Sequence, residues 1–224
     1  MKRKLPLSAL LVLLPQLCLA QGPNNIITLD FEGLKDLEPV LNYYNGGFGG
    51  NGSGPGPHDN ITFPDGSLAI TSKVAGGQGM FSNEPSPSNA LFFQSGGGDV
   101  MNVGGGFTGG FSFFYTGGLA GAVTVWSGTD GTGTQLASLN LASVGPNNDT
   151  WLPVGVSFNG VAGSVNFSGT ANNIAFDNIT LGSAIPTGAS SVPAPSSLTA
   201  LAVAALFGAG AGWRRRRARS IRAH

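Results

Sequence analysis

Three carboxylates stand at positions from which an antiparallel fold can bring them together. Asp30 and Glu32 lie in the first predicted strand, and Asp177 lies in the last. Terminal strands of such folds often pair, so these oxygens can converge on Ca²⁺, which prefers oxygen ligands. Two carboxylates at a set separation are also what glycoside hydrolysis requires. The alternative is three separate carboxylates that are exposed or cap loops.

Aromatic side chains form a second candidate site. Tyr43 and Tyr44 precede a glycine-rich loop that contains Phe48. Exposed rings in such a place can stack against sugar rings, so we expect Tyr43, Tyr44 and Phe48 to form an exposed patch that binds a ligand. Trp126 and Trp151 could serve the same purpose, but we expect both to pack in the core or at a sheet edge.

Other reactive residue types are scarce. The only cysteine, Cys18, lies in a predicted leader, which leaves no thiol for a disulfide, a zinc site or nucleophilic attack. The only histidine of the central region is His58, in a glycine-rich loop that cannot hold a catalytic base rigidly. The glycine-rich loops lack the lysine and the following helix that phosphate cradles require. We expect no enzyme activity, and no cofactor other than a structural Ca²⁺.

Period-two alternation predicts the strands that must position these side chains. The clearest runs are residues 111–115, 122–126, 135–142, 152–158 and 174–181. Residues 26–31 predict the first strand, and residues 61–63 and 68–70 predict a hairpin around Pro64-Asp65-Gly66. The phase of the alternation shifts at Asp177 and Asn178, which predicts a β-bulge there.

No stretch of the central region has a helical period, and many of the chain's 37 glycines fall between the apolar runs. Disorder would show few large apolar residues and no period, so it fits less well. We therefore predict that residues 21–183 form an all-β domain, an antiparallel β-sandwich that is jelly-roll-like.

The charges divide the chain into three parts. The formal net charge is zero, because 11 Lys and Arg balance 11 Asp and Glu. The basic residues gather at the two ends, and the central region holds only Lys35 and Lys73 against all 11 acidic residues, a net charge of −9. Such an acidic domain has no electrostatic basis for binding nucleic acid.

Residues 1–20 are typical of a secretory signal peptide. A basic segment at residues 2–4 precedes an apolar segment at residues 5–14, and small residues favour cleavage before Gln21. The apolar segment is too short to span a bilayer, which requires about 20 residues. Lipid attachment at Cys18 is the alternative, but Leu17 stands where a lipobox has a small residue.

The C-terminal region predicts a membrane anchor. Residues 184–195 form a linker rich in Pro, Ser and Ala that contains a sorting motif, residues 196–213 a short transmembrane helix, and residues 214–224 an Arg-rich cytoplasmic tail. The uncharged core of that helix would span about 24 Å at about 1.5 Å per residue. Arginines that reach toward the interface can make up part of the difference from a bilayer core of about 30 Å. Positive charge holds the tail in the cytoplasm, so the β domain lies outside it.

This tail resembles the PEP-CTERM sorting signal, which exosortase enzymes process in exopolysaccharide-producing Gram-negative bacteria. The motif residues are Val192, Pro193, Ala194 and Pro195. The basic cluster is Arg214, Arg215, Arg216 and Arg217. Ala194 stands where the family has Glu. The resemblance implies an exosortase-type partner at the inner membrane and transfer of the domain to the cell surface or extracellular matrix.

The β domain is also similar to the secreted sandwich domains that often precede such tails, in its opening strand around Asp30 and its closing strand around Asp177. Together these features predict an exported cell-surface or matrix protein with a structural or adhesive role. The alternative is a carbohydrate-binding module for exopolysaccharide, supported by Ca²⁺ if the carboxylates converge.

Overall fold

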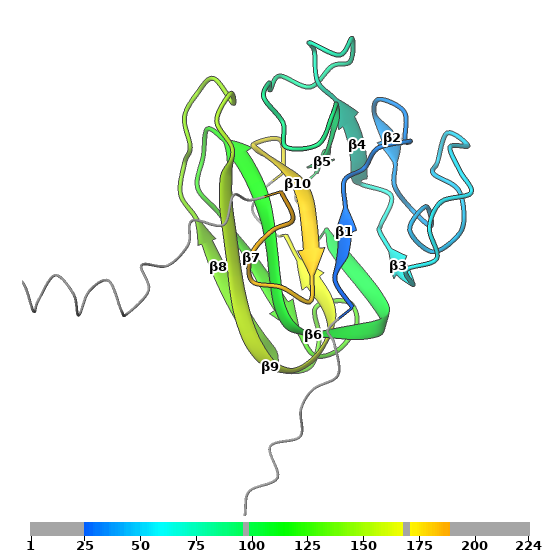
Figure 1. The fold of residues 1–224 in the computed structure, drawn as a ribbon, viewed down its shortest axis with the longest axis vertical. Helices are drawn as coiled ribbons and strands as arrows, with labels where there is room; N and C mark the ends of the chain where they lie inside the picture. The colour runs from blue at the N-terminus through cyan, green and yellow to red at the C-terminus, as the bar shows by residue number, and fades with distance from the viewer. Residues whose placement is uncertain (1–24, 96–98, 168–170, 189–224) are drawn as a thin grey trace, which may run out of the picture. The chain divides into compact units, whose positions relative to one another are not determined.

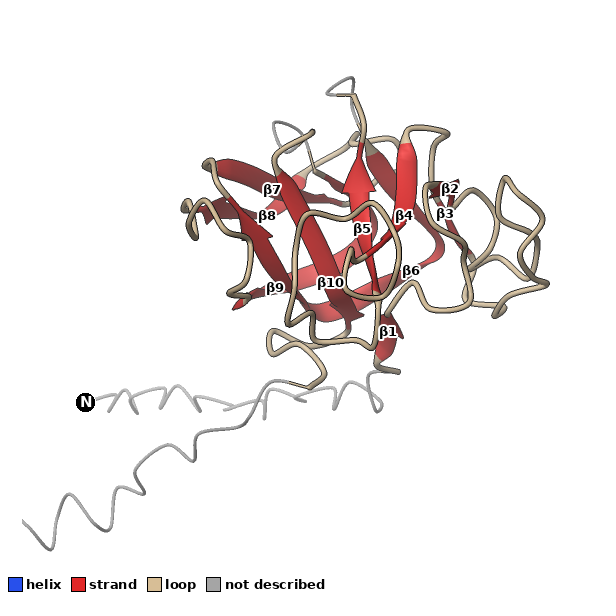
Figure 2. Cartoon of the chain, turned by 90° about the horizontal axis from the view of Figure 1, so that it is seen from above, coloured by secondary structure: helices blue, strands red, loops and turns tan. Residues whose placement is uncertain are grey.

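The structure, a computed structural model, describes residues 25–95, 99–167 and 171–188. These residues form strands and loops, with no helix among them (Figure 2). In this part of the chain no helix has the length and hydropathy needed to cross a membrane. The predicted signal peptide, the motif at residues 192–195, the helix at residues 196–213 and the arginine cluster lie outside the described residues.

Ten antiparallel strands make up the described region, so the prediction of an all-β antiparallel fold is confirmed (Figure 1). The strands are β1 (Ile27–Leu29), β2 (Glu38–Pro39), β3 (Ile61–Thr62), β4 (Ser67–Thr71), β5 (Asn89–Phe93), β6 (Val100–Gly117), β7 (Gly121–Trp126), β8 (Gln135–Leu141), β9 (Leu152–Asn166) and β10 (Ile174–Leu181).

The long strands β6 and β9 belong to two layers. Their halves at residues 111–115 and 152–156 pair with each other, and this half of β6 also pairs with β10, giving a layer in the order β2-β4-β5-β10-β6-β9. Their other halves pair with each other and with β3 and β7, giving a second layer in the order β3-β6-β9-β7-β8. Strand β1 pairs with the end of β10, beyond its pairing with β5.

Glycines allow β6 to pass from one layer to the other. Asn102 pairs with Ser164 and Phe107 with Ala162, so four residues of β6 lie opposite one residue of β9. One of the four is Gly106, whose φ of 65° lies in the left-handed region that other residues rarely adopt. The bulge bends β6 sharply and lets its two halves face each other across the core.

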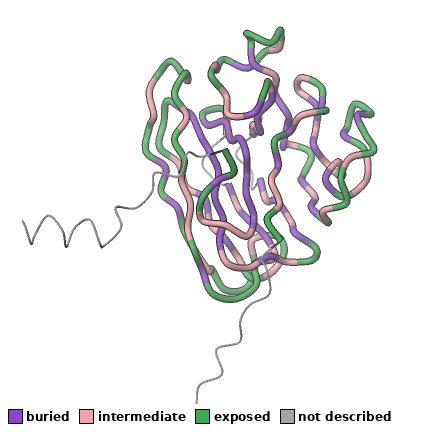
Figure 3. Tube along the Cα trace, in the orientation of Figure 1, coloured by how far each residue is buried: buried purple, intermediate pink, exposed green. Residues whose placement is uncertain are grey.

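Aromatic rings fill the space between the layers. Phe167, directly after β9, is fully buried and lies 5.2 Å from Phe93, 6.3 Å from Phe111, 6.4 Å from Phe113 and 5.0 Å from Phe176, between ring centroids. Such tilted and edge-on contacts are the favoured geometries for aromatic pairs. Buried residues concentrate on the strands and exposed ones on the loops (Figure 3).

Two predictions about strands are wrong. Residues 61–63 and 68–70 do not form a hairpin, because β3 pairs with β6 and β4 pairs with β5 and β2. Pro64-Asp65-Gly66 does turn, with Ser67 N–H donating to the Pro64 carbonyl at 3.1 Å, but this turn connects the two layers. The first strand ends at Leu29 instead of Phe31, since Phe31 has a φ of 62° that ends the extended backbone.

The predicted bulge near the end of the last strand is confirmed. The register of β10 against β6 shifts between Asp177 and Thr180, and Asn178 has a φ of 47°. Asparagine tolerates this left-handed conformation better than most residues. The bulge allows Phe176 and Ile179 to face the same core although they are three residues apart.

The first residues after β10 pack on the sandwich. Gly182 N–H donates to the Gly110 carbonyl at 2.9 Å, and the Ser112 hydroxyl donates to the Ser183 carbonyl at 2.9 Å. Gly155 lies so close to Ala184 that a Cβ at position 155 would collide with its carbonyl oxygen. The start of the predicted solvated linker is therefore part of the fold up to residue 188.

We predict that Phe167→Ala lowers the free energy of unfolding by about 3–5 kcal/mol, because it opens a cavity among four rings. Denaturant unfolding followed by circular dichroism measures this loss. Phe48→Ala is the control, since the Phe48 side chain is 55% exposed and should cost about 0.5 kcal/mol or less. Equal losses for the two variants would contradict the role of Phe167.

Candidate functional site

Two of the three predicted carboxylates, Glu32 and Asp177, bind one segment, residues 86–89, just before β5. Glu32 accepts hydrogen bonds from the backbone N–H groups of Ser88 and Asn89, both at 2.8 Å, and from the Ser88 hydroxyl at 2.9 Å. Asp177 accepts one from the Ser86 N–H at 2.6 Å. The carboxylates of Glu32 and Asp177 therefore fix the entry of the chain into the sheet.

Asp30 lies near Asp177, as the predicted pairing of the terminal strands requires. β1 pairs with β10 in the register Leu29–Ile179, and the Asp30 carboxylate accepts a hydrogen bond from Glu32 N–H at 3.2 Å. Within the described ranges no group of three or more His, Cys, Asp or Glu is arranged to hold a metal ion. The Ca²⁺ site at Asp30, Glu32 and Asp177 stays a prediction.

Burial raises the pKa of Asp177 to about 7, against an ordinary value of 3.8. Hydrogen bonds from Ser86 and from the Asn178 N–H lower this pKa, and the charge of Asp30 raises it further. The side chain is fully buried on the face of β10 opposite the core, beneath the segment that contains Ser86. Asp177 therefore carries a proton in the folded state up to near-neutral pH.

The predicted aromatic patch is wrong for Tyr44 and in part for Tyr43. The Tyr44 ring is 3% exposed, and its hydroxyl accepts a hydrogen bond from Phe31 N–H at 2.7 Å. Tyr43 is half-buried, packs edge-on against Tyr44 at 5.2 Å, and donates to the Glu32 carbonyl at 3.2 Å. Phe48 alone is exposed as expected. The glycine-rich loop therefore uses the two tyrosines for packing.

Glu38 holds that glycine-rich loop in place. Its carboxylate is fully buried and accepts hydrogen bonds from the N–H groups of Lys35 at 2.7 Å, Asn51 at 2.8 Å and Ser53 at 3.0 Å, and from the Ser53 hydroxyl. Burial alone would raise the pKa of Glu38, but these donors lower it below its usual value. One ionised side chain thus holds the glycine-rich loop at residues 46–56 in a fixed arrangement.

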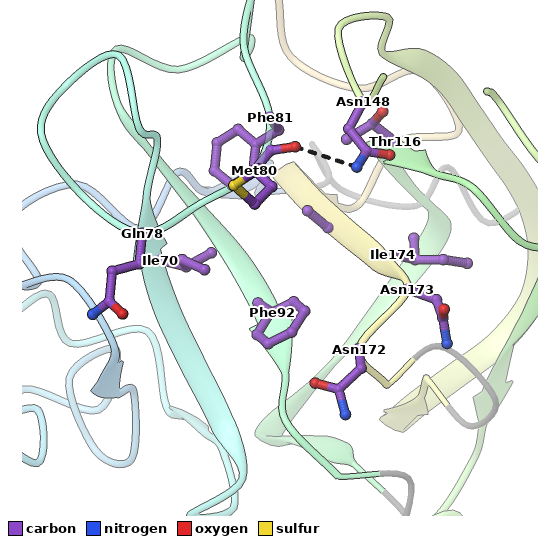
Figure 4. Close-up of a pocket in the computed structure, with 11 residues that line it drawn as sticks. Ile70, Gln78, Met80, Phe81, Phe92, Thr116, Asn148, Asn172, Asn173 and Ile174 are labelled. Carbon is purple, nitrogen blue, oxygen red and sulfur yellow. Dashed lines mark hydrogen bonds between the residues drawn. The ribbon is translucent and has the colours of Figure 1, made fainter. Parts of the chain in front are cut away.

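A pocket of about 220 Å³ opens on the outer face of the first layer (Figure 4). Thr116, Ala175 and Phe92 are direct cross-strand neighbours on β6, β10 and β5, and they alternate with residues that point into the core. Ile70 of β4 lies beside them. These four side chains give the pocket a largely apolar floor.

Loops supply the polar rim. Asn172 and Asn173 come from the turn before β10, Asn148 from the loop before β9, and Gln78 from the loop after β4. Asn172 donates to the Gln94 carbonyl at 2.7 Å, and Asn148 donates to the Met80 carbonyl at 3.2 Å. Figure 4 shows these amides around Phe92.

Trp151 supports one wall of the pocket. Its ring packs edge-on against Phe81 at 5.5 Å, and its Nε1–H donates to the Ser82 carbonyl at 3.0 Å. Phe81 is buried and lines the pocket next to Met80, which is 69% exposed. The expectation that Trp151 packs in the core or at a sheet edge is confirmed.

Two polar atoms of the pocket are buried without a partner. Thr116 Oγ1 and Asn148 Oδ1 have no hydrogen bond within the described residues. The only other such side-chain atom in this part of the chain, Ser67 Oγ, is not among those that line the pocket. A buried polar group without a partner costs about 1–3 kcal/mol, so these two atoms have hydrogen-bonding capacity that the described residues do not use.

The chemistry of the pocket is neutral. Among the described residues that line it, none is charged or titratable near neutral pH. An apolar floor that contains an aromatic ring, under amide and hydroxyl groups, suits an uncharged ligand with both C–H surfaces and hydroxyl groups. Six separate stretches of the chain contribute to the pocket, which is why the sequence alone did not predict it.

A scan against protein-family models finds no match to the chain, and a search of the curated proteins finds none either. Among solved structures, a family 6 carbohydrate-binding module matches with a TM-score of 0.37 and 18% identity, over 53% of this chain and 83% of that chain. CsCBM6-3 from Clostridium stercorarium, in complex with cellobiose, matches with a TM-score of 0.36 and 16% identity, over 55% and 86%.

A family 29 carbohydrate-binding module from Piromyces equi matches over 71% of this chain and 86% of that chain, with a TM-score of 0.30 and 12% identity. Scores this low do not establish a common fold or a common ligand. The pocket must therefore be judged on its own geometry.

We predict that the stability of the protein falls as pH rises from about 4 to about 7, because in this window Asp177 keeps in the folded state a proton that the unfolded chain has released. Within this window each pH unit lowers the free energy of unfolding by about 1.4 kcal/mol, so the total loss approaches about 4 kcal/mol. Asp177→Asn should lose this component, which urea unfolding at several pH values measures.

Asp65→Asn is the control, because Asp65 is exposed and lies in a surface turn. Its stability should follow the same pH profile as that of the unchanged protein. If Asp177→Asn and the unchanged protein had parallel profiles between pH 4 and pH 7, the elevated pKa of Asp177 would be refuted.

Proposed function

We propose that this chain is an exported, non-enzymatic protein that binds carbohydrate through a jelly-roll-like β-sandwich. In this proposal its ligand is an uncharged stretch of polysaccharide at the cell surface or in the extracellular matrix. Binding to such a polymer would give the protein its structural or adhesive role.

The pair of unpartnered atoms, Thr116 Oγ1 and Asn148 Oδ1, is the observation that carries the proposal. A hydroxyl group of a sugar can donate to the amide oxygen of Asn148, and another can accept from the hydroxyl of Thr116. The C–H face of the same ring can lie on Phe92, which is partly exposed in the floor. One pocket thus offers both kinds of contact that a sugar ring requires.

The size of the pocket supports recognition of a small unit of a longer chain. A volume of about 220 Å³ lies below the range of about 300–1,000 Å³ for sites that hold drug-sized ligands. A single sugar residue in such a site binds weakly. A polymer with many identical units, held close to many copies of the protein, can compensate through multivalent binding.

The proposal of a non-enzymatic role rests on the same geometry. General acid–base catalysis needs a titratable group within hydrogen-bonding reach of the reacting atom. The described residues that line the pocket include no such group, and Glu32 and Asp177 are bonded to backbone N–H groups elsewhere. A glycosidase mechanism through Asp30, Glu32 or Asp177 is therefore not part of the proposal.

We further propose that the PEP-CTERM-like tail delivers the domain, through a temporary inner-membrane anchor and an exosortase-type enzyme. The sequence motif around Pro193 and Pro195, the apolar run and the arginine cluster support this route. Export explains why an acidic, cysteine-free domain is flanked by two basic ends.

We predict that Thr116→Val weakens carbohydrate binding about tenfold, the loss of roughly one hydrogen bond, while it raises the free energy of unfolding by about 1 kcal/mol. The stability rises because valine keeps the shape and removes a buried hydroxyl without a partner. Isothermal titration with neutral polysaccharides, selected on a glycan array, measures the first effect, and thermal unfolding measures the second.

Ser67→Ala is the matched control, since Ser67 Oγ is also buried without a partner but does not line the pocket. It should raise stability in the same way and leave binding unchanged. Unchanged binding by Thr116→Val would show that the sugar binds elsewhere, and no binding by the unchanged protein to any glycan would overturn the proposed function.

We predict that residues 184–224 are sufficient to anchor and sort an exported reporter in a host with an active exosortase. Ala194→Glu should increase the cleaved fraction, because it restores the residue that the sorting family carries. Immunoblotting of membrane and extracellular fractions measures the two forms. The control is the same reporter without residues 184–224. If the fused reporter stays uncleaved with either residue at position 194, and is found in the same fractions as this control, sorting by the tail is refuted.

A further inference from the structure

A second recess, of about 510 Å³, lies against the second layer of the sandwich. Its walls come from β3, the first half of β6, the loop between β7 and β8, and the loop between β2 and β3. The lining residues are Asn45, Asn60, Thr62, Asn102, Gly104, Gly105, Thr129 and Asp130. All of these are polar residues or glycines.

The recess opens on the outer face of this layer. Met101 and Val103 are buried in the core, so Asn102 between them points to the opposite face. Thr62 is the direct cross-strand partner of Asn102 and follows the core residue Ile61, so it lies on the same outer face. The first pocket and this recess therefore open on outer faces of different layers.

Hydrogen bonds hold the polar wall in a fixed arrangement. The Asn102 amide donates to the Asp130 carboxylate at 2.7 Å, and Asp130 N–H donates back to the Asn102 side-chain oxygen at 2.8 Å. Ser164 fixes the same loop, accepting from Gly131 N–H at 3.0 Å and donating to the Gly128 carbonyl at 2.6 Å. Such preorganised groups lose little entropy when a ligand binds.

Bare backbone forms the floor of the recess. Gly104 and Gly105 are exposed and have no left-handed φ, and a Cβ added to them would meet its first neighbour only at 3.5 Å and 3.9 Å. The packing of the protein therefore does not require glycine at either position, in contrast to Gly106 next to them. What these two glycines do provide is room for another molecule to approach the backbone closely.

We propose that this recess is a second carbohydrate-binding site, for an uncharged polysaccharide chain, and that the domain can bridge two such chains. The proposal rests on the function proposed above. Asn102 uses one of the roughly four acceptor positions of the Asp130 carboxylate, and the remaining positions can accept from neighbouring sugar hydroxyls. The amide groups of Asn45 and Asn60 can both donate and accept.

The charge of the recess selects against acidic sugars. Its described lining contains the Asp130 carboxylate and no cation, so a uronate or sulfate group would be repelled. Nucleotides and phosphorylated ligands are disfavoured for the same reason. The glycine floor, which carries no side chains, suits the C–H face of a sugar ring, and a volume of about 510 Å³ has room for more than one ring.

Gly105→Val tests the site by filling it. The new side chain should occupy the recess without disturbing the fold, since Gly105 has open space around its Cβ position. Gly118→Val is the matched control, because Gly118 is also exposed, has no left-handed φ and lies outside both recesses. Titration calorimetry with cellohexaose, β-1,4-galactan fragments and galactomannan gives the number of sites.

The unchanged protein and Gly118→Val should each bind two oligosaccharides and clump galactomannan-coated beads. Gly105→Val should bind one oligosaccharide and lose the clumping, with at least a tenfold drop in bead aggregation. Thr116→Val, which weakens the first pocket, should retain binding at the second site. If thermal unfolding shows that Gly105→Val is misfolded, Asp130→Asn replaces it. This variant keeps the size of the side chain and removes the carboxylate, so it should weaken binding at the second site.

The two variants distinguish failure of the second site from failure of the first pocket. Equal stoichiometry and equal clumping for Gly105→Val and the unchanged protein would overturn the second site. If Thr116→Val still weakened the binding that remains in that case, the first pocket would stand. Failure of the unchanged protein to bind any of the three probes would count against both proposals. Loss of all binding in Thr116→Val would also overturn the second site.

Discussion

The packing of aromatic rings between two layers that share β6 and β9 is the constraint on which the rest of the structure depends. Because Phe167 touches rings from β5, β6 and β10, the second half of β9 is held against the first layer. The bend at Gly106 makes that contact possible. The outer face of the first layer carries a pocket with an apolar floor, and the outer face of the second layer carries a polar recess. Loops between the strands supply part of the walls of both.

Much of the fold could be predicted from the sequence, because strand alternation is a local property. The runs that include β6, β7, β9 and β10 and the bulge after Asp177 follow directly from it. Strand partners are not local, which is why a correct turn at Pro64-Asp65-Gly66 led to a wrong hairpin. The hydrogen bonds of Glu32 and Asp177 to the segment before β5 could not be predicted, because they join residues more than 50 positions apart.

The first pocket lay beyond sequence reasoning for a physical reason. Thr116 and Asn148 are ordinary residues in ordinary positions, and only the surrounding packing leaves their polar atoms without partners. Tyr44 shows the converse, since a residue that suits sugar stacking instead completes the core and binds the Phe31 backbone. The proposed site is defined by the hydrogen-bonding groups that the fold leaves without partners.

The position of β10 has a mechanical consequence. This strand carries Ala175 in the floor of the first pocket and leads directly into the segment at residues 182–188, which is clamped against Gly110 and Ser112. β10 has β6 on one side and β5 and then β1 on the other. A pull along the chain from its C-terminal side therefore loads many hydrogen bonds at once, in shear, instead of opening them one by one. Such a strand arrangement resists a pull applied to the chain at residue 188.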